Sequence, residues 1–159
     1  MQIEKYQVET TIDSLIYTFE SVGKTTIKKV VEYTKVNPFY FDLPSNLDVY
    51  NLAFGDWDDE INDFKDTITS NNGDMEKVLA TVANTVFSFW ESYPDATIFF
   101  QGSQISGEEP LRTYLYQRKM ERYFEEISNV AYVFGKFNDR LEIFTKGKTY
   151  SNFLIIRKS

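Results

Sequence analysis

Residues 74–93, DMEKVLATVANTVFSFWESY, give the clearest structural signal in the chain, because their apolar side chains recur at the spacing of one helix face. The stripe consists of Met75, Val78, Leu79, Val82, Val86, Phe89, Trp90 and Tyr93. Asn72 and Gly73 can cap the first turn, where Asp74 favours the positive end of the helix dipole. Pro94 then ends the helix, since proline cannot continue the hydrogen-bond ladder. The segment predicts an amphipathic helix that buries one face.

The segments on either side have the composition of β-strands. Residues 96–101 form a short apolar run of the kind that is buried on both faces, which predicts a central strand. Upstream, residues 15–20 and 26–33 alternate in polarity and are rich in β-branched and aromatic residues, so they predict two strands. Gly23 lies between them, where a hairpin turn with a positive φ is expected. A further short strand is predicted for residues 48–54.

The C-terminal part predicts a second helix and three more strands. The helix is expected from about Pro110 to Ile127. The strands are expected at residues 130–137, 140–144 and 152–157, connected as a meander. The chain of 159 residues suits a single domain, residues 1–159. The predicted class is α+β: a largely antiparallel sheet with two main helices packed on one face, in a strand order that the pattern does not specify.

The chain contains no Cys and no His, and these absences exclude several kinds of chemistry. Without Cys there is no disulfide, thiol nucleophile or thiolate metal site, and without His no catalytic triad that needs an imidazole base. Zinc, copper and haem sites are disfavoured for the same reason, whereas Mg²⁺ and Ca²⁺ could still bind carboxylates. We therefore predict no cofactor and no metal site.

The charge and hydropathy of the chain limit its partners and its location. There are 17 Lys and Arg against 24 Asp and Glu, a net charge of −7 that argues against nucleic acid as a partner. No apolar run approaches the roughly 18 residues that a membrane helix needs, and the N-terminus lacks the apolar region of a secretory signal. We therefore expect no membrane association, a cytoplasmic location, and an unknown protein or small molecule as partner.

Two motifs resemble known sites but lack required residues. Gly23-Lys24-Thr25 resembles the end of a P-loop, but position 18 is Thr and the residues that follow predict a strand rather than a helix. The acidic residues 56–63 resemble a calcium loop, but its sixth position is Ile61 and its twelfth is Thr67. A solvated acidic connection is the simpler interpretation. Weak Mg²⁺ or Ca²⁺ binding, or acid–base chemistry if burial raises the pKa of one carboxyl group, are the alternatives.

Two polar loops are candidates for a shared site. Residues 70–74 hold more capping side chains than one helix start needs. Structural capping is the simpler interpretation, and the spare groups could instead bind a ligand or brace a neighbouring loop. Gly102 and Ser103 follow the predicted central strand, and Arg112 lies near the start of the next helix, an arrangement that can bind an anion. An internal salt bridge from Arg112 to Glu108 or Glu109 is the alternative.

Three segments together resemble a bacterial family of small proteins of unknown function. They are Phe54-Gly55-Asp56, then Ser70-Asn71-Asn72-Gly73-Asp74 leading into the helix, then Gly102-Ser103 with Arg112-Thr113 and Leu115-Tyr116. The third departs from the family pattern, since Gln104 replaces a Thr, Tyr114 replaces an Arg and the intervening loop is longer. The resemblance implies no activity. It adds weight to one set of ligand-binding candidates: Asp56, Asn71, Asn72, Asp74, Gly102, Ser103 and Arg112.

These observations predict an uncharacterised cytoplasmic protein that acts as a non-catalytic binding or protein-interaction module. Its site is expected to be a polar pocket formed where the loops of Asn72 and Arg112 approach each other, so that Asn72→Ala weakens binding with little change in melting temperature. The alternative is a small enzyme acting on a phosphorylated or carboxylated small molecule, with Arg112 as anion clamp and Asp56 or Asp74 as base or Mg²⁺ ligand.

Overall fold

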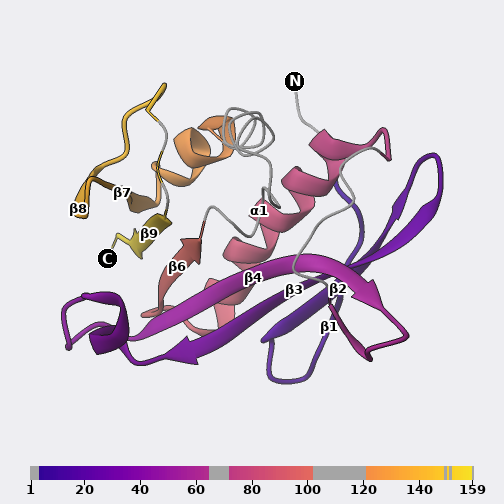
Figure 1. Ribbon diagram of the computed structural model, residues 1–159, viewed down its shortest axis with the longest axis horizontal. Helices are drawn as coiled ribbons and strands as arrows, with labels where there is room; N and C mark the ends of the chain where they lie inside the picture. Colours follow the sequence, from indigo (N-terminus) through magenta and orange to yellow (C-terminus); the bar gives the residue numbers. More distant parts are fainter. Residues whose placement is uncertain (1–3, 65–71, 102–120, 149, 151, 159) are drawn as a thin grey trace.

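The computed structural model describes residues 4–64, 72–101, 121–148, 150 and 152–158 of the chain. Most of the strands belong to one sheet, whose order is β1-β2-β3-β4-β6-β9-β7-β8, with β5 paired to β4 beside this path (Figure 1). The N-terminal strands are β1 (Glu9–Thr10), β2 (Ile16–Val22), β3 (Thr26–Val36), β4 (Val49–Asp58) and β5 (Asp63–Phe64). The later ones are β6 (Thr97–Gln101), β7 (Ala131–Phe137), β8 (Arg140–Ile143) and β9 (Asn152–Arg157).

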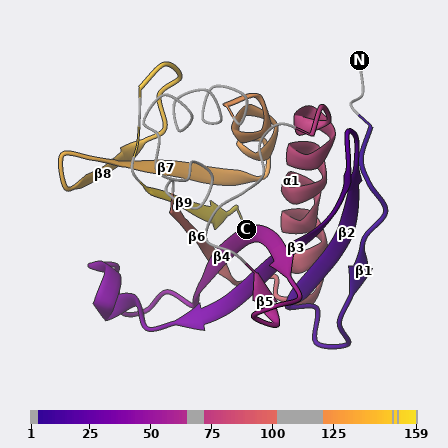
Figure 2. The same cartoon turned by 45° about the vertical axis from the view of Figure 1, so that its right-hand side comes forward.

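Two helical segments cover one face of this sheet. Helix α1 (Met75–Ser92) runs across the N-terminal strands, and residues 121–127 are helical near β7 and β9 (Figure 2). Side chains of α1 and of Tyr123, Phe124 and Ile127 share one core with the facing strands. The predicted α+β class and the mostly antiparallel sheet are confirmed, since β4 and β6 form the only parallel pair among the described strands.

The opposite face of the sheet holds a smaller apolar cluster. It consists of Leu43, Val49, Phe99 and Leu154, with Val36, Leu47, Phe134 and Ile156 packed around it. The 3-10 helix η1 (Pro38–Phe41) follows β3, and its start is capped by Asn37, whose side chain accepts a hydrogen bond from the Phe39 amide at 3.0 Å. Because β6 and β9 contribute buried residues to both faces, they lie in the middle of the sheet, as predicted for β6.

The predicted meander of the last three strands is wrong. Strand β9 pairs with β6 and β7 rather than with β8, so it enters the sheet between them. The physical reason is burial: β9 contains three consecutive buried residues, Phe153 to Ile155, which need cover on both faces, whereas the residues of β8 are exposed or half-buried. The predicted turn at Asn138-Asp139 is confirmed, with positive φ at both residues, as two-residue hairpin loops favour.

Strand β4 runs further than predicted, from Val49 to Asp58 instead of ending at Phe54. Its extension is paired with β3, where Val30 lies opposite Gly55 and Lys29 opposite Asp56. Part of the predicted acidic connection is therefore strand. None of the described helices is long and apolar enough to cross a membrane.

Candidate binding site

Asn72, one of the predicted site residues, braces the turn between β2 and β3. Its side-chain oxygen accepts a hydrogen bond from the Thr25 amide at 2.9 Å, and its side-chain nitrogen donates to the Thr25 carbonyl and to the Ser21 hydroxyl, each at 2.9 Å. Its backbone carbonyl accepts from the Lys24 amide at 3.1 Å. The Asn72 side chain is buried, and both its amide oxygen and its amide nitrogen are hydrogen-bonded. These contacts favour the role of bracing a neighbouring loop over that of binding a ligand.

Gly23 lies in this turn for a reason other than the one predicted. It is not among the described residues with positive φ. A Cβ atom there would lie 1.7 Å from the Asn72 carbonyl oxygen, far inside contact distance. Glycine is required by the close approach of the two backbones, which sequence spacing alone does not reveal.

Asp74 joins the same cluster from the start of α1. Its carboxylate accepts hydrogen bonds from the Tyr6 hydroxyl and, at 2.6 Å, from the Ser21 hydroxyl. It occupies the N-cap position but makes no side-chain capping bond. Burial, with the neighbouring Asp74 carboxylate, raises the pKa of Tyr6, so the phenol stays a hydrogen-bond donor at neutral pH. We call the cluster of Tyr6, Ser21, Thr25, Asn72 and Asp74 the hairpin brace.

Asp56 is buried in an ion pair with Lys29, which corrects the prediction that it lies in a solvated connection. The side chains are 1% exposed for Lys29 and 6% for Asp56, and both face the helices, in the same row of the sheet as Phe19. A solvated turn is present only further along, where the Asp58 carboxylate accepts from the Glu60 amide at 2.9 Å. The counter-charge lies 27 residues away in the chain, so the acidic pattern alone could not show it.

The remaining predicted site residues, Asn71, Gly102, Ser103 and Arg112, lie outside the described residues. The shared polar pocket therefore stays a prediction. Within the part of the chain that the structure describes, no group of three carboxylates is placed to hold a metal ion. For the enzyme alternative, Asp56 already neutralises a buried ammonium and Asp74 already accepts two hydroxyl bonds.

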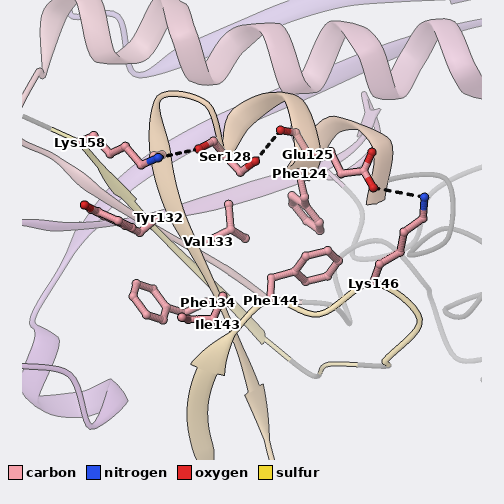
Figure 3. Close-up of a pocket in the computed structure, with 11 residues that line it drawn as sticks. Phe124, Glu125, Ser128, Tyr132, Val133, Phe134, Ile143, Phe144, Lys146 and Lys158 are labelled. Atoms are coloured by element: carbon pink, nitrogen blue, oxygen red, sulfur yellow. Dashed lines mark hydrogen bonds and ion pairs between the residues drawn. The ribbon is translucent and has the colours of Figure 1, made fainter.

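A second candidate site lies between helical residues 121–127 and the hairpin of β7 and β8. This recess has a volume of about 400 Å³. Its apolar walls are formed by Phe124, Tyr132, Val133, Phe134, Ile143 and Phe144 (Figure 3). Strand β8 ends at Ile143, and beyond it the Phe144 amide donates to the Val133 carbonyl at 2.9 Å.

The rim of the recess carries polar groups from the end of the helical segment and from two lysines. Lys146 pairs with Glu125 at 3.2 Å, and both side chains are more than half exposed. Lys158 donates to the Ser128 carbonyl at 3.0 Å and lies 5.1 Å from the centre of the Tyr132 ring. Figure 3 shows the two lysines at opposite sides of the recess. The site therefore combines an apolar interior with a charged rim, which is the usual make-up of a small-molecule pocket.

The chain matches one protein family over nearly its whole length. A model described as a family of unknown function (DUF6934) matches residues 2–158. The chain belongs to this family. No curated protein and no solved structure matches it. Membership in DUF6934 confirms that the chain belongs to a family of unknown function, and it assigns no activity.

The residues of the recess were not among the predicted site residues of this DUF6934 member. Most of them fall in the helix and strands predicted at residues 110–127, 130–137 and 140–144, where no binding motif marks them. A signal was present in the sequence: Tyr132, Phe134 and Ile143 are apolar at the alternate positions where a solvated edge hairpin would carry polar residues. Tyr132 is 56% and Ile143 75% exposed.

Proposed function

We propose that this DUF6934 member is a non-catalytic binding protein and that the recess beside β7 and β8 is its ligand site. The observation that carries the proposal is the recess itself, since its volume of about 400 Å³ lies within the range of about 300–1,000 Å³ typical of ligand pockets. Aromatic walls supply most of the binding free energy in such sites, and a few polar groups orient the ligand.

The contacts of the described acidic candidates support a binding role over a catalytic one. A general base or Mg²⁺ ligand must be available to the substrate. Asp56 is instead buried against Lys29, and Asp74 accepts hydroxyl bonds from Tyr6 and Ser21. The chain also lacks His and Cys, the residues that most often supply nucleophiles and bases near neutral pH. A bacterial source, a cytoplasmic location and the polar pocket near Arg112 stay predictions.

A fluorescence titration with the neutral dye prodan tests the recess. The dye should shift to shorter wavelength on binding the folded protein. Ser128→Trp should abolish the shift, because Ser128 is an exposed residue that lines the recess and an indole there would fill it. Asn129→Trp is the matched control, since Asn129 is the next residue, equally exposed, and does not line the recess.

Circular dichroism should show that both variants are folded at the temperature of the titration. If the native protein gives no shift, or if Ser128→Trp binds the dye as well as Asn129→Trp does, the recess is not the ligand site.

A further inference from the structure

We propose that the ligand of the recess is a small amphiphilic carboxylate, whose apolar body lies against the aromatic walls and whose carboxylate pairs with Lys158. This inference rests on the proposed function and specifies its ligand chemistry. It follows from three observations: the charge of this part of the molecule, the contacts of Lys158, and the apolar character of the walls.

The recess lies in the cationic part of an acidic protein. Residues 121–158 contain seven Lys and Arg against five Asp and Glu, although the whole chain has a net charge of −7. Three charged side chains line the recess, and two of them, Lys146 and Lys158, are cationic. A charge asymmetry of this kind favours an anionic ligand at the cationic end of the molecule.

Lys158 is the cation on this rim that is paired with neutral groups. Its described contacts are the Ser128 carbonyl at 3.0 Å and the face of the Tyr132 ring, whereas Lys146 is paired with Glu125. An ammonium group has three N–H donors, so Lys158 can donate to an incoming carboxylate while it keeps the Ser128 carbonyl.

The carbonyl groups at the C-terminal end of helical residues 121–127 do not strongly repel an anion bound at Lys158. The carbonyls of Phe124, Glu126 and Ile127 accept backbone amide bonds from Ser128, Asn129 and Val130. The Glu125 carbonyl accepts from the Ser128 hydroxyl at 2.5 Å, and the Ser128 carbonyl from Lys158. Because these oxygens are already bonded, the partial negative charge of the helix end is offset within the chain.

The apolar walls of the recess favour an apolar body for the ligand. Phe124 and Val133 are almost fully buried at the back of the recess, and the Phe124 ring packs 5.2 Å from that of Phe144. Such a surface accepts an alkyl or aryl group and offers few hydrogen bonds to a polar one. A carboxylate joined to an apolar body satisfies both parts of the site.

Competition between two eight-carbon ligands for bound prodan tests the inference, because they share a tail and differ in head group. At pH 7 and low salt, octanoate should displace the dye at a concentration about two- to fivefold lower than octanol does. A purely apolar pocket gives the reverse order, since the ionised head group favours water. Added salt should reduce the preference for octanoate.

Variants of Lys158 connect the preference to one side chain. Lys158→Met should remove the preference for octanoate while octanol still competes, and Lys158→Arg should retain it, because the guanidinium keeps the charge and the donors. Lys35→Met makes the same change in net charge at a distant exposed ion pair with Asp48 and should leave the preference unchanged.

The outcomes separate this inference from the proposed function. If octanol displaces prodan and octanoate is no better, the carboxylate inference is wrong and the apolar binding site stands. The carboxylate inference is also wrong if Lys158→Met keeps the preference or if neither compound displaces bound dye. If prodan itself does not bind, both proposals are wrong.

Discussion

The hairpin brace and the recess use their side chains in opposite ways. In the brace, every described polar side chain bonds to another part of the chain: Asn72 to the turn at Thr25, and Asp74 to Tyr6 and Ser21. In the recess, apolar side chains leave about 400 Å³ unfilled. A dense polar motif in a sequence can therefore serve folding, while an ordinary apolar strand can line a site.

The difference has a physical basis in how each kind of group is satisfied. A buried polar group that lacks a partner is costly, so capping and amide side chains are recruited by the nearest backbone that needs them. Apolar side chains need no hydrogen-bond partner, so they can remain exposed at an edge where β8 is shorter than β7. Three experiments measure what buried polar groups contribute to stability, in order of decreasing effect.

The largest effect is expected for Asp56→Ala, which removes the carboxylate that pairs with the buried ammonium group of Lys29. The free energy of unfolding should fall by about 3–5 kcal/mol, as measured by urea denaturation. The double variant Lys29→Met with Asp56→Leu is the control and should recover most of this loss, because it removes both charges together. A stable Asp56→Ala protein would show that this pair is dispensable for folding and would return Asp56 to the list of ligand-binding candidates.

Asn72→Ala should have the next largest effect, since it deletes hydrogen bonds to the Thr25 amide, the Thr25 carbonyl and the Ser21 hydroxyl. We expect the free energy of unfolding to fall by about 2–3 kcal/mol, the cost of leaving buried backbone groups unbonded. This reverses the expectation, drawn from the sequence, of a nearly unchanged melting temperature. The control Asn129→Ala, at an exposed position, should change the free energy of unfolding by less than about 0.5 kcal/mol. If the two variants have equal melting temperatures, the hydrogen bonds of Asn72 in the hairpin brace do not stabilise the fold.

The smallest effect concerns two tyrosines that pack edge to face beneath α1, Tyr17 and Tyr33. The Thr85 hydroxyl donates to the Val82 carbonyl at 2.6 Å, so the Tyr33 hydroxyl donates to Thr85 at 2.8 Å. Tyr33→Phe should therefore destabilise by about 1 kcal/mol. The Tyr17 hydroxyl is the one buried side-chain polar atom among the described residues without a partner, so Tyr17→Phe should be neutral or stabilising.

Thermal denaturation of the two tyrosine variants measures this difference directly, with each serving as the control for the other. Burial raises the pKa of Tyr17 to about 12, so its phenol is neutral at the pH of the experiment. If Tyr17→Phe destabilises more than Tyr33→Phe does, hydrogen-bond satisfaction is not what separates these positions.

Much of the fold could be predicted from sequence because it depends on neighbours in the chain. The 3.6-residue stripe predicted a helix over residues 74–93, where α1 spans Met75–Ser92, and the alternation on either side of Gly23 predicted β2 and β3. The end of β4 and the pairing of β9 were missed. Both depend on a partner strand that is distant in sequence, Lys29 of β3 for Asp56 and β6 for β9.

The candidate site was less predictable than the fold for the same reason. Asn72 and Asp74 were noticed because capping residues are dense around them, but a motif shows which groups are available and not what they bond to. The recess gave no motif, since its walls come from residues 121–127, β7 and β8, and its one signal was the apolar alternation of Tyr132, Phe134 and Ile143.

The α+β class, the position of α1 and the lack of thiol and imidazole side chains follow from the amino-acid sequence, because periodicity and composition are properties that folding does not change. The place of β9 between β6 and β7, the pairing of Lys29 with Asp56 and the recess beside Lys158 are seen only in the folded chain. These features depend on contacts between segments far apart in the chain, and the partner in such a contact is fixed by packing rather than by spacing.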